Sequence, residues 1–232
     1  MSTSPTPPEP SRILLATLTV LTVVSGMVDA VSYLGLGHVF TANMTGNIVL
    51  LGFAAAGAKG FSIAASLTSL GSFLLGAAVA GRMTLHVGSR RLWLVFAMAA
   101  EGGFTGVAAV VSAFNSGSVS TGWPRYAVIA LLAFAMGVRN STIRRLAVPE
   151  VTTTVLTMTL TGLAADSSLA GGHNPRIARR TSAIAAMLVG AFVGAELFLH
   201  QGATWPLAIV AAAVLVTGTL FAASRASRQL DA

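Results

Sequence analysis

The chain has 232 residues, of which 54% are hydrophobic and only 9% are charged. Soluble domains carry about 25% charged residues, so these few charges cannot cover a water-exposed surface and a soluble globular fold is excluded. The net charge of +7 would suggest nucleic acid as a partner, but the basic residues lie between apolar runs. The lack of cysteine excludes disulfides and thiolate chemistry. We therefore interpret the chain as an all-α polytopic membrane protein, whose partner is the lipid bilayer and not nucleic acid.

The chain begins with a proline-rich polar segment, residues 1–12, which is predicted to be a disordered tail. Six later runs have the length of about 20 apolar residues that a helix needs to cross a bilayer. They cover residues 13–36, 61–81, 92–114, 126–143, 181–199 and 203–224. Two shorter apolar segments, 43–58 and 152–165, open with Asn or Thr. They either cross as short helices or are re-entrant, entering and leaving on one side.

The basic residues discriminate between these alternatives, because cytoplasmic flanks of membrane helices collect Lys and Arg. If the short segments do not cross and the N-terminus is inside, the inner flanks hold twelve basic residues and the outer flanks only Lys59 and Arg125. If both segments cross, the split is eight against six. We therefore predict six spans with both termini in the cytoplasm. Trp123 and Trp205 then begin two helices at the outer interface, where Trp is common.

An internal repeat connects the two halves at an offset of 111 or 112 residues. The aligned pairs are Gly26 with Gly137, Asp29 with Asn140, Thr41 with Thr153 and Thr45 with Thr157. Each half contains a span, a short polar helix and two more spans. Because three spans is an odd number, the halves have opposite orientations, an inverted repeat common in secondary transporters. We divide the chain into a first membrane repeat (13–114), an outer linker (115–125), a second membrane repeat (126–224) and a cytoplasmic tail (225–232).

The segment 26–52, GMVDAVSYLGLGHVFTANMTGNIVLLG, together with residues 137–140 and 153–157, resembles the YoaK-like family of bacterial multi-pass membrane proteins of unknown function. The Thr-Gly-Asn motif at residues 45–47, after a first helix that carries an Asp, is its most specific part. Met158 departs from the pattern, because a Gly is expected there. The resemblance implies a location in the bacterial cytoplasmic membrane and transfers no catalytic residues.

Polar side chains in the predicted spans and short helices are the candidates for a substrate- or ion-binding site. They are Asp29, Thr41, Asn43, Thr45, Asn47, Glu101, Asn140, Thr153, Thr157 and Thr159. Hydroxyl and amide groups at membrane depth can bind a neutral polar solute or a cation, and the N-termini of half-helices offer N–H groups to an anion. Alternatively, these side chains only satisfy backbone groups where a helix breaks inside the membrane.

Charged side chains within the spans have alternative interpretations. Asp29 is either a proton or cation site, or it caps the following loop or reaches outer water. A pair with Arg139 requires both side chains to reach inward, and we expect Arg139 instead to extend to the inner headgroups. Glu101 is the deeper acid, while Glu196 and Asp166 are expected to face water. Asp29 or Glu101 would then carry a coupling proton.

These features favour a transporter of a small molecule or an ion that works by alternating access. The alternative is a non-transporting scaffold or assembly partner. GxxxG motifs, in which three residues separate two glycines, occur at Gly102 with Gly106 and at Gly190 with Gly194. They indicate close helix packing and are compatible with a homo-oligomer. An intramembrane enzyme is less favoured and no catalytic residue is assigned, because the sequence has no His-Glu-x-x-His or Gly-x-Ser-x-Gly motif. No cofactor or metal is expected.

Overall fold

The computed structural model describes residues 11–84, 88–115, 121–146, 156–173 and 177–224, and every regular element in these ranges is helical. Six helices are long and apolar enough to cross a membrane. They are α1 (Arg12–Gly35), α3 (Ile63–Met83), α4 (Arg90–Phe114), α5 (Gly122–Leu146), α7 (Ile177–Gln201) and α8 (Thr204–Ala223). Two shorter helices, α2 (Met44–Ala55) and α6 (Leu156–Ala165), and a 3-10 turn, η2 (Ser168–Ala170), complete the chain. The prediction of six spanning helices is confirmed.

Polar residues define where the spanning helices begin. Ser11, Ser62 and Ser89 precede α1, α3 and α4, and each side chain accepts a hydrogen bond from a backbone N–H of the first turn, at 3.3, 3.3 and 3.1 Å. The Trp-Pro pairs that begin at Trp123 and Trp205 lie in the first turns of α5 and α8, where Pro disrupts no helical hydrogen bond. Because α5 starts at Gly122, it includes the last residues of the predicted linker 115–125.

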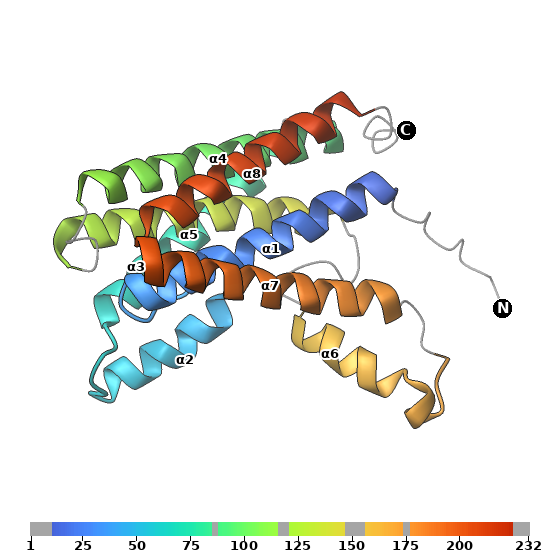
Figure 1. Cartoon of the computed structure of the whole chain (residues 1–232), viewed down its shortest axis with the longest axis horizontal. Coiled ribbons are helices and arrows are strands. Elements are labelled where there is room, and N and C mark those ends of the chain that lie inside the picture. The colour runs from blue at the N-terminus through green and yellow to red at the C-terminus, as the bar shows by residue number, and fades with distance from the viewer. Residues whose placement is uncertain (1–10, 85–87, 116–120, 147–155, 174–176, 225–232) are drawn as a thin grey trace.

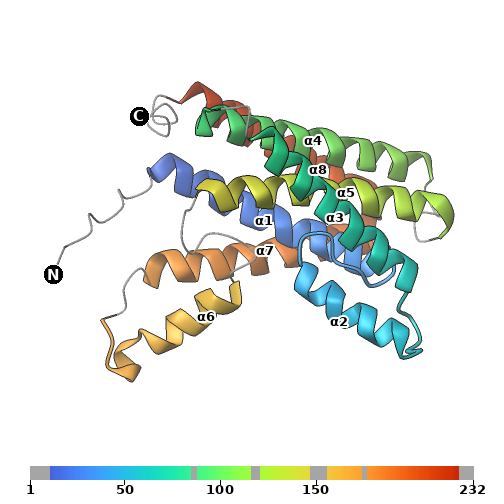
Figure 2. The same cartoon turned by 180° about the vertical axis from the view of Figure 1, so that it is seen from behind.

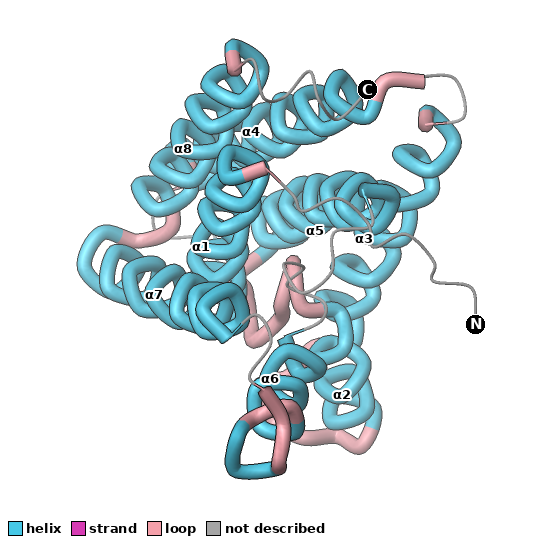
Figure 3. The backbone as a smooth tube through the Cα atoms, turned by 90° about the vertical axis from the view of Figure 1, so that its right-hand side faces the viewer, coloured by secondary structure: helices cyan, strands magenta, loops and turns pink. Residues whose placement is uncertain are grey.

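The six long helices form one bundle with α1 and α5 at its centre (Figure 3). These two helices have the largest buried share of the six. α1 packs against α7 and α8, α5 packs against α3 and α4, and α4 packs against α8. Outward-facing side chains such as Leu74, Leu188 and Phe192 are large, apolar and more than half exposed. The outer surface of the bundle is therefore suited to lipid and not to water.

Glycines bring α1 and α7 into backbone contact. A Cβ atom added at Gly26 would overlap the carbonyl oxygen of Met187, and one at Gly190 would overlap the carbonyl oxygen of Val23. Only glycine fits at both positions, because the clashing atoms belong to the backbone and cannot turn away. The close packing predicted for Gly190 is thus confirmed, although its contact is within the chain.

The same glycine contacts occur between α5 and α3. A Cβ at Gly137 would overlap the carbonyl oxygen of Phe73, and one at Gly76 would overlap that of Phe134. Gly137 and Phe134 lie 111 positions after their counterparts Gly26 and Val23 in α1. The α7 residues at this contact likewise follow their α3 counterparts by 114 positions. Two helix pairs in different halves of the chain therefore pack through corresponding residues.

The short helices α2 and α6 stand on the same side of the bundle (Figures 1 and 2). Their N-terminal ends point toward the middle of the molecule, and their C-terminal ends point toward opposite ends of the bundle. α2 packs against α3, and α6 packs against α7. At 1.5 Å per residue they are about 18 and 15 Å long, too short for a hydrocarbon core of about 30 Å. Neither helix is long enough to cross such a core by itself, which favours the re-entrant alternative.

The first prediction concerns the glycine contacts. Gly76→Ala should lower the unfolding midpoint in detergent, with a loss of about 1–3 kcal/mol, because its methyl group meets a backbone oxygen of α5. Gly71→Ala in the same helix is the control, because nothing lies within 4 Å of a Cβ there. It should leave stability unchanged or raise it by up to about 1 kcal/mol through helix propensity. Equal midpoints for the two variants would contradict this packing.

Candidate functional site

The loop between α1 and α2 turns back into the protein. It leaves α1 through two residues with positive φ, Gly37 at 85° and His38 at 58°. Asp29 then holds the loop, because its Oδ1 accepts hydrogen bonds from the backbone N–H groups of Thr41 at 3.0 Å and Ala42 at 2.8 Å. Asp29 is only 5% exposed, so it caps the loop and does not reach outer water.

The side-chain amide of Asn47 ties α2 to the same loop. Its Oδ1 accepts from the N–H of Phe40 at 2.8 Å, and its Nδ2 donates to the carbonyl of Phe40 at 2.6 Å. Nδ2 also donates to Oγ of Ser69 in α3 at 3.0 Å, and that hydroxyl donates to the Phe40 carbonyl at 2.6 Å. Asn47 and Ser69 are fully buried. Thr41, also fully buried, donates from Oγ1 to Ser32 at 3.5 Å.

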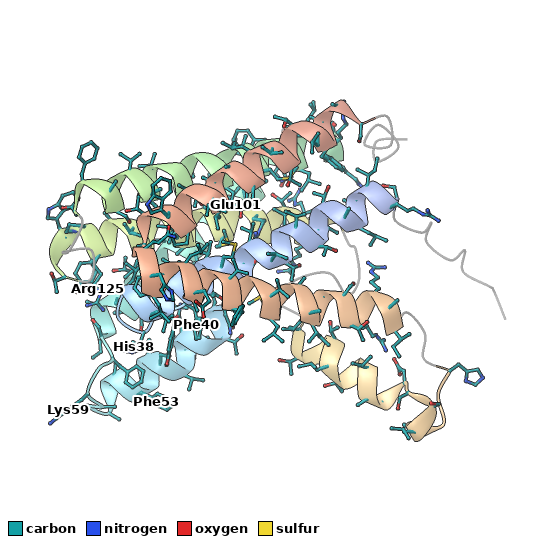
Figure 4. The ribbon with its side chains drawn as sticks, viewed as in Figure 1. His38, Phe40, Phe53, Lys59, Glu101 and Arg125 are labelled. Carbon is teal, nitrogen blue, oxygen red and sulfur yellow. The ribbon has the colours of Figure 1, made fainter. Side chains whose placement is uncertain are left out.

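Aromatic and basic side chains surround this loop at the end of the bundle where α1 ends (Figure 4). Phe40 stacks on Tyr33 with ring centroids 4.9 Å apart, and the His38 ring nitrogen Nδ1 lies 3.0 Å from the carbonyl of Gly60. Arg125, at the start of α5, donates from Nε to the carbonyl of Leu36 at 2.8 Å. These contacts fix the loop at both its ends.

The remaining polar candidates of the short helices separate into exposed and buried side chains. Asn43 caps α2 by accepting from the N–H of Gly46 at 3.4 Å, and it is exposed together with Thr45. In α6, Thr157 is exposed and Thr159 is buried. Thr153 lies outside the described residues. The exposed hydroxyl and amide groups therefore lie at the N-terminal ends of α2 and α6.

A buried ion pair joins α4 and α5 inside the bundle. Arg139 Nη1 lies 2.9 Å from Oε1 of Glu101, and the two side chains are 1% and 0% exposed. Nη1 also donates to the carbonyl of Leu21 at 3.1 Å, and Nη2 donates to Oγ of Ser25, both in α1. Figure 4 places Glu101 in the middle of the bundle. Three central helices are thus joined by one guanidinium.

This ion pair corrects two expectations. Arg139 does not extend to the inner headgroups, because α5 continues for two further turns to Leu146 and leaves the side chain too deep. It is therefore not a flanking basic residue, and eleven of the twelve basic residues assigned to the inner flanks remain. Its partner is Glu101 and not Asp29. Asn140, the next residue of α5, is half-buried.

The acids expected to face water lie at the ends of their elements. Asp166 is 44% exposed and its Oδ2 lies 2.7 Å from Nη1 of Arg180, which also donates to the carbonyl of Gly162 at 2.6 Å. This pair attaches α6 to α7. Glu196 is 52% exposed and lies 3.4 Å from His200.

Together, the six spans, the lipid-facing surface and the ion pair sealed inside the bundle define a multi-pass α-helical membrane protein. A family described as "Protein of unknown function (DUF1275)" matches residues 17–220. The chain belongs to this family. It is 38% identical over 156 residues to the UPF0700 transmembrane protein YoaK of Bacillus subtilis (strain 168), a match that covers 65% of this chain and 66% of YoaK, just under two thirds. The resemblance to the YoaK-like family is thus confirmed. No solved structure matches the chain.

The second prediction concerns the buried pair. Arg139→Met leaves Glu101 buried without its partner and should destabilise the fold by about 3–5 kcal/mol. The double variant Glu101→Met with Arg139→Met should recover most of this loss, since replacing a buried pair by apolar groups of similar volume is often neutral. The measurement is the folded, monodisperse fraction and its thermal midpoint in detergent. A double variant no better than the single one would contradict the pairing.

Proposed function

We propose that this protein is a transporter of a small polar solute or an ion, which works by alternating access around the N-terminal ends of α2 and α6. The observation that carries the proposal is that these two ends point toward the middle of the molecule, while the C-terminal ends of α2 and α6 point toward opposite ends of the bundle (Figure 1). Half-helix N-termini bring partial positive charge and N–H donors to membrane depth. Irregular backbone at that depth is tolerated where it is buried in protein or lines a water-filled cavity.

The depth of the two short helices supports this proposal. Asn47 in α2 bonds to Ser69, which lies six residues into α3 and so about 9 Å from its start. In α6, Gly162 lies beside Arg180, near the start of α7, and Leu156 is six residues or about 9 Å deeper. Both N-terminal ends therefore lie well between the two ends of the bundle, and each is reached from a different end.

Two inverted repeats are part of the proposal, and the packing supports them. Each position buried in α1 between Thr17 and Ser32 has a buried counterpart 111 residues later in α5, except Asp29, whose counterpart Asn140 is half-buried. The packing of α1 on α7 and of α2 on α3 has its counterpart in α5 on α3 and α6 on α7. Such halves can rock against each other around a central site, which is how many secondary transporters alternate their access.

Three exposed side chains are the proposed contacts for the solute, Asn43 and Thr45 from α2 and Thr157 from α6. Their hydroxyl and amide groups are on the surface of the short helices. In contrast, Asn47 is bonded to Phe40 of the loop, and Thr41, which is in the loop, is bonded to Ser32 of α1. We therefore assign solute binding to the three exposed side chains, and support of the loop between α1 and α2 to the two buried ones.

A scaffold role is less well supported by the packing. The glycines that favoured it face other helices of the same chain, since Gly102 contacts Leu215 in α8 and Gly194 contacts Met27 in α1. They are therefore not available to a partner protein.

We further propose the bacterial cytoplasmic membrane as the location, with both termini inside. Arg82, Arg90 and Arg91 lie at one end of the bundle, and Lys59 and Arg125 lie at the other. The start of α1 and the end of α8 are both at the arginine-rich end (Figure 1).

The third prediction tests this orientation together with the re-entrant helices. The chain has no cysteine, so a single introduced thiol is the only one present. Lys59→Cys, after α2, should react with a membrane-impermeant maleimide added to intact cells. Leu169→Cys, after α6 and 99% exposed, should react only after the membrane is opened. Labelling of both from the same side would contradict the opposite entry of the two helices.

The fourth prediction tests transport. Purified protein in sealed vesicles should move at least one member of a panel of ions and small polar solutes. Thr45→Val and Thr157→Val should reduce this flux at least tenfold, because each removes a hydroxyl from the proposed path. Thr219→Val, an exposed Thr of α8 on another part of the bundle, is the isosteric control and should leave it unchanged. Absence of flux across the panel, or equal flux in all three variants, would contradict the proposal.

A further inference from the structure

Asp29 lies on the same face of α1 as the residues that contact Arg139, one turn further along the helix. We call Asp29, Glu101, Arg139 and Ser25 the polar layer. Leu21, Ser25 and Asp29 are four residues apart and so share one face of α1. The first two receive hydrogen bonds from the guanidinium of Arg139. Asp29 is one turn, about 6 Å, further toward the outer end of the helix.

Only one oxygen of the Asp29 carboxyl is engaged. Oδ1 accepts from the N–H groups of Thr41 and Ala42, while Oδ2 is buried and has no hydrogen-bond partner among the described residues. Oε2 of Glu101 and Nε of Arg139 are also buried and have no hydrogen-bond partner among the described residues. The layer therefore has polar atoms with capacity for a further small ligand.

The elements packed against α1 bring few other charges to Asp29. α8 contains no charged residue. The charged residues of α7 lie near its two ends, with Arg179 and Arg180 at one end and Glu196 and His200 at the other. α5 contributes Arg139, whose direct partner is Glu101. Among the described residues of α1, α5, α7 and α8, the charged group closest along the bundle to Asp29 is therefore the guanidinium of Arg139, which is paired with Glu101.

A second ionised carboxylate here would be a buried charge without a cation in direct contact, which a low-dielectric interior disfavours. Because the guanidinium of Arg139 is paired with Glu101, Asp29 is the carboxyl group that we expect to be neutral. We propose that Asp29 holds an exchangeable proton on Oδ2 and is the site of the coupling proton in this transporter. Its role in coupling rests on the proposed function, while the presence of the proton does not. This assignment decides between the two acids that the sequence left open.

The geometry connects the proton to the re-entrant loop. When Oδ2 releases its proton to the aqueous side that is open, the carboxylic acid becomes a carboxylate with no other bond changed. Its hydrogen bonds from Thr41 and Ala42 then become charge-assisted and stronger. The new negative charge also adds to the electrostatic attraction between α1 and the guanidinium of Arg139 in α5. Occupancy of the proton site thus alters how α1 holds both the loop before α2 and the central helix α5.

The repeat provides the neutral equivalent of this side chain. Asn140 corresponds to Asp29 in the second half, and it is an uncharged residue of the same shape. Asp29→Asn keeps an oxygen that can accept the two loop N–H groups and removes the proton, so it is the matched test variant.

The test is infrared spectroscopy of the purified full-length protein in lipid nanodiscs. At neutral pH the wild type should show the C=O stretch of a protonated carboxyl group, which is separate from carboxylate absorption. The band should be absent in Asp29→Asn and present in the control Glu196→Gln, whose carboxyl is half-exposed. Protein labelled with ¹³C at the aspartate carboxyl should shift the band without any substitution, and labelling at glutamate should not. Absence of the band, or a shift only on glutamate labelling, would overturn the proposal.

Transport separates this inference from the proposed function. If the band behaves as expected but no solute moves, the proton site stands and the transporter proposal fails. If solute moves and the band is absent, the transporter proposal stands and the proton site is wrong. Where both succeed, a pH gradient should drive uptake at least tenfold in the wild type and have no effect on uptake in Asp29→Asn. Uptake by that variant that still follows the pH gradient would place the coupling proton elsewhere and overturn the assignment.

Discussion

The structure depends on one constraint, that backbone N–H and C=O groups inside a bilayer must find partners within the protein. The chain leaves helical geometry after α1 and returns into the bundle before α2 begins. Asp29 accepts from two N–H groups of this segment, and Asn47 pairs with both backbone groups of Phe40. Without these two side chains, backbone groups of Phe40, Thr41 and Ala42 would lose the hydrogen-bond partners that they have here. Their burial follows from this need, and it also explains why Thr45 and not Asn47 remains on the surface.

Glycine contacts set the frame on which the loop is held. Backbone contact of α1 with α7, and of α5 with α3, leaves α1 and α5 at the centre, where their polar faces meet other protein and not lipid. This position allows Arg139 to be sealed among α1, α4 and α5. The proposed transport cycle uses the same frame, since each short helix attaches to the outer member of a glycine-packed pair, α3 or α7.

Composition and charge predicted the coarse fold because membrane spans are set by length and hydropathy, which one sequence contains in full. The ion pair was missed for a local reason. The interpretation of Arg139 as a flanking residue overlooks the pairing of α4 with α5, which follow each other as an antiparallel pair and place Arg139 within about one turn of Glu101. The alignment of the two helices across the short connection between them could have predicted this ion pair from the sequence. The i, i+4 spacing of Asn43 and Asn47 could not show which of them is buried, because this depends on where α3 lies. The placement of Thr153 lies outside the described residues.

The central claim is that α2 and α6 enter from opposite sides with their N-terminal ends toward each other. Spin labels in a lipid bilayer test it most directly, since the chain offers no competing cysteine. The distance between labels at Thr45→Cys and Thr157→Cys is compared with that between labels at Ala55→Cys and Ala165→Cys, all exposed positions. Two short helices that diverge over about 18 and 15 Å predict a markedly shorter distance for the first pair. Equal distances, or a shorter second distance, would contradict the account.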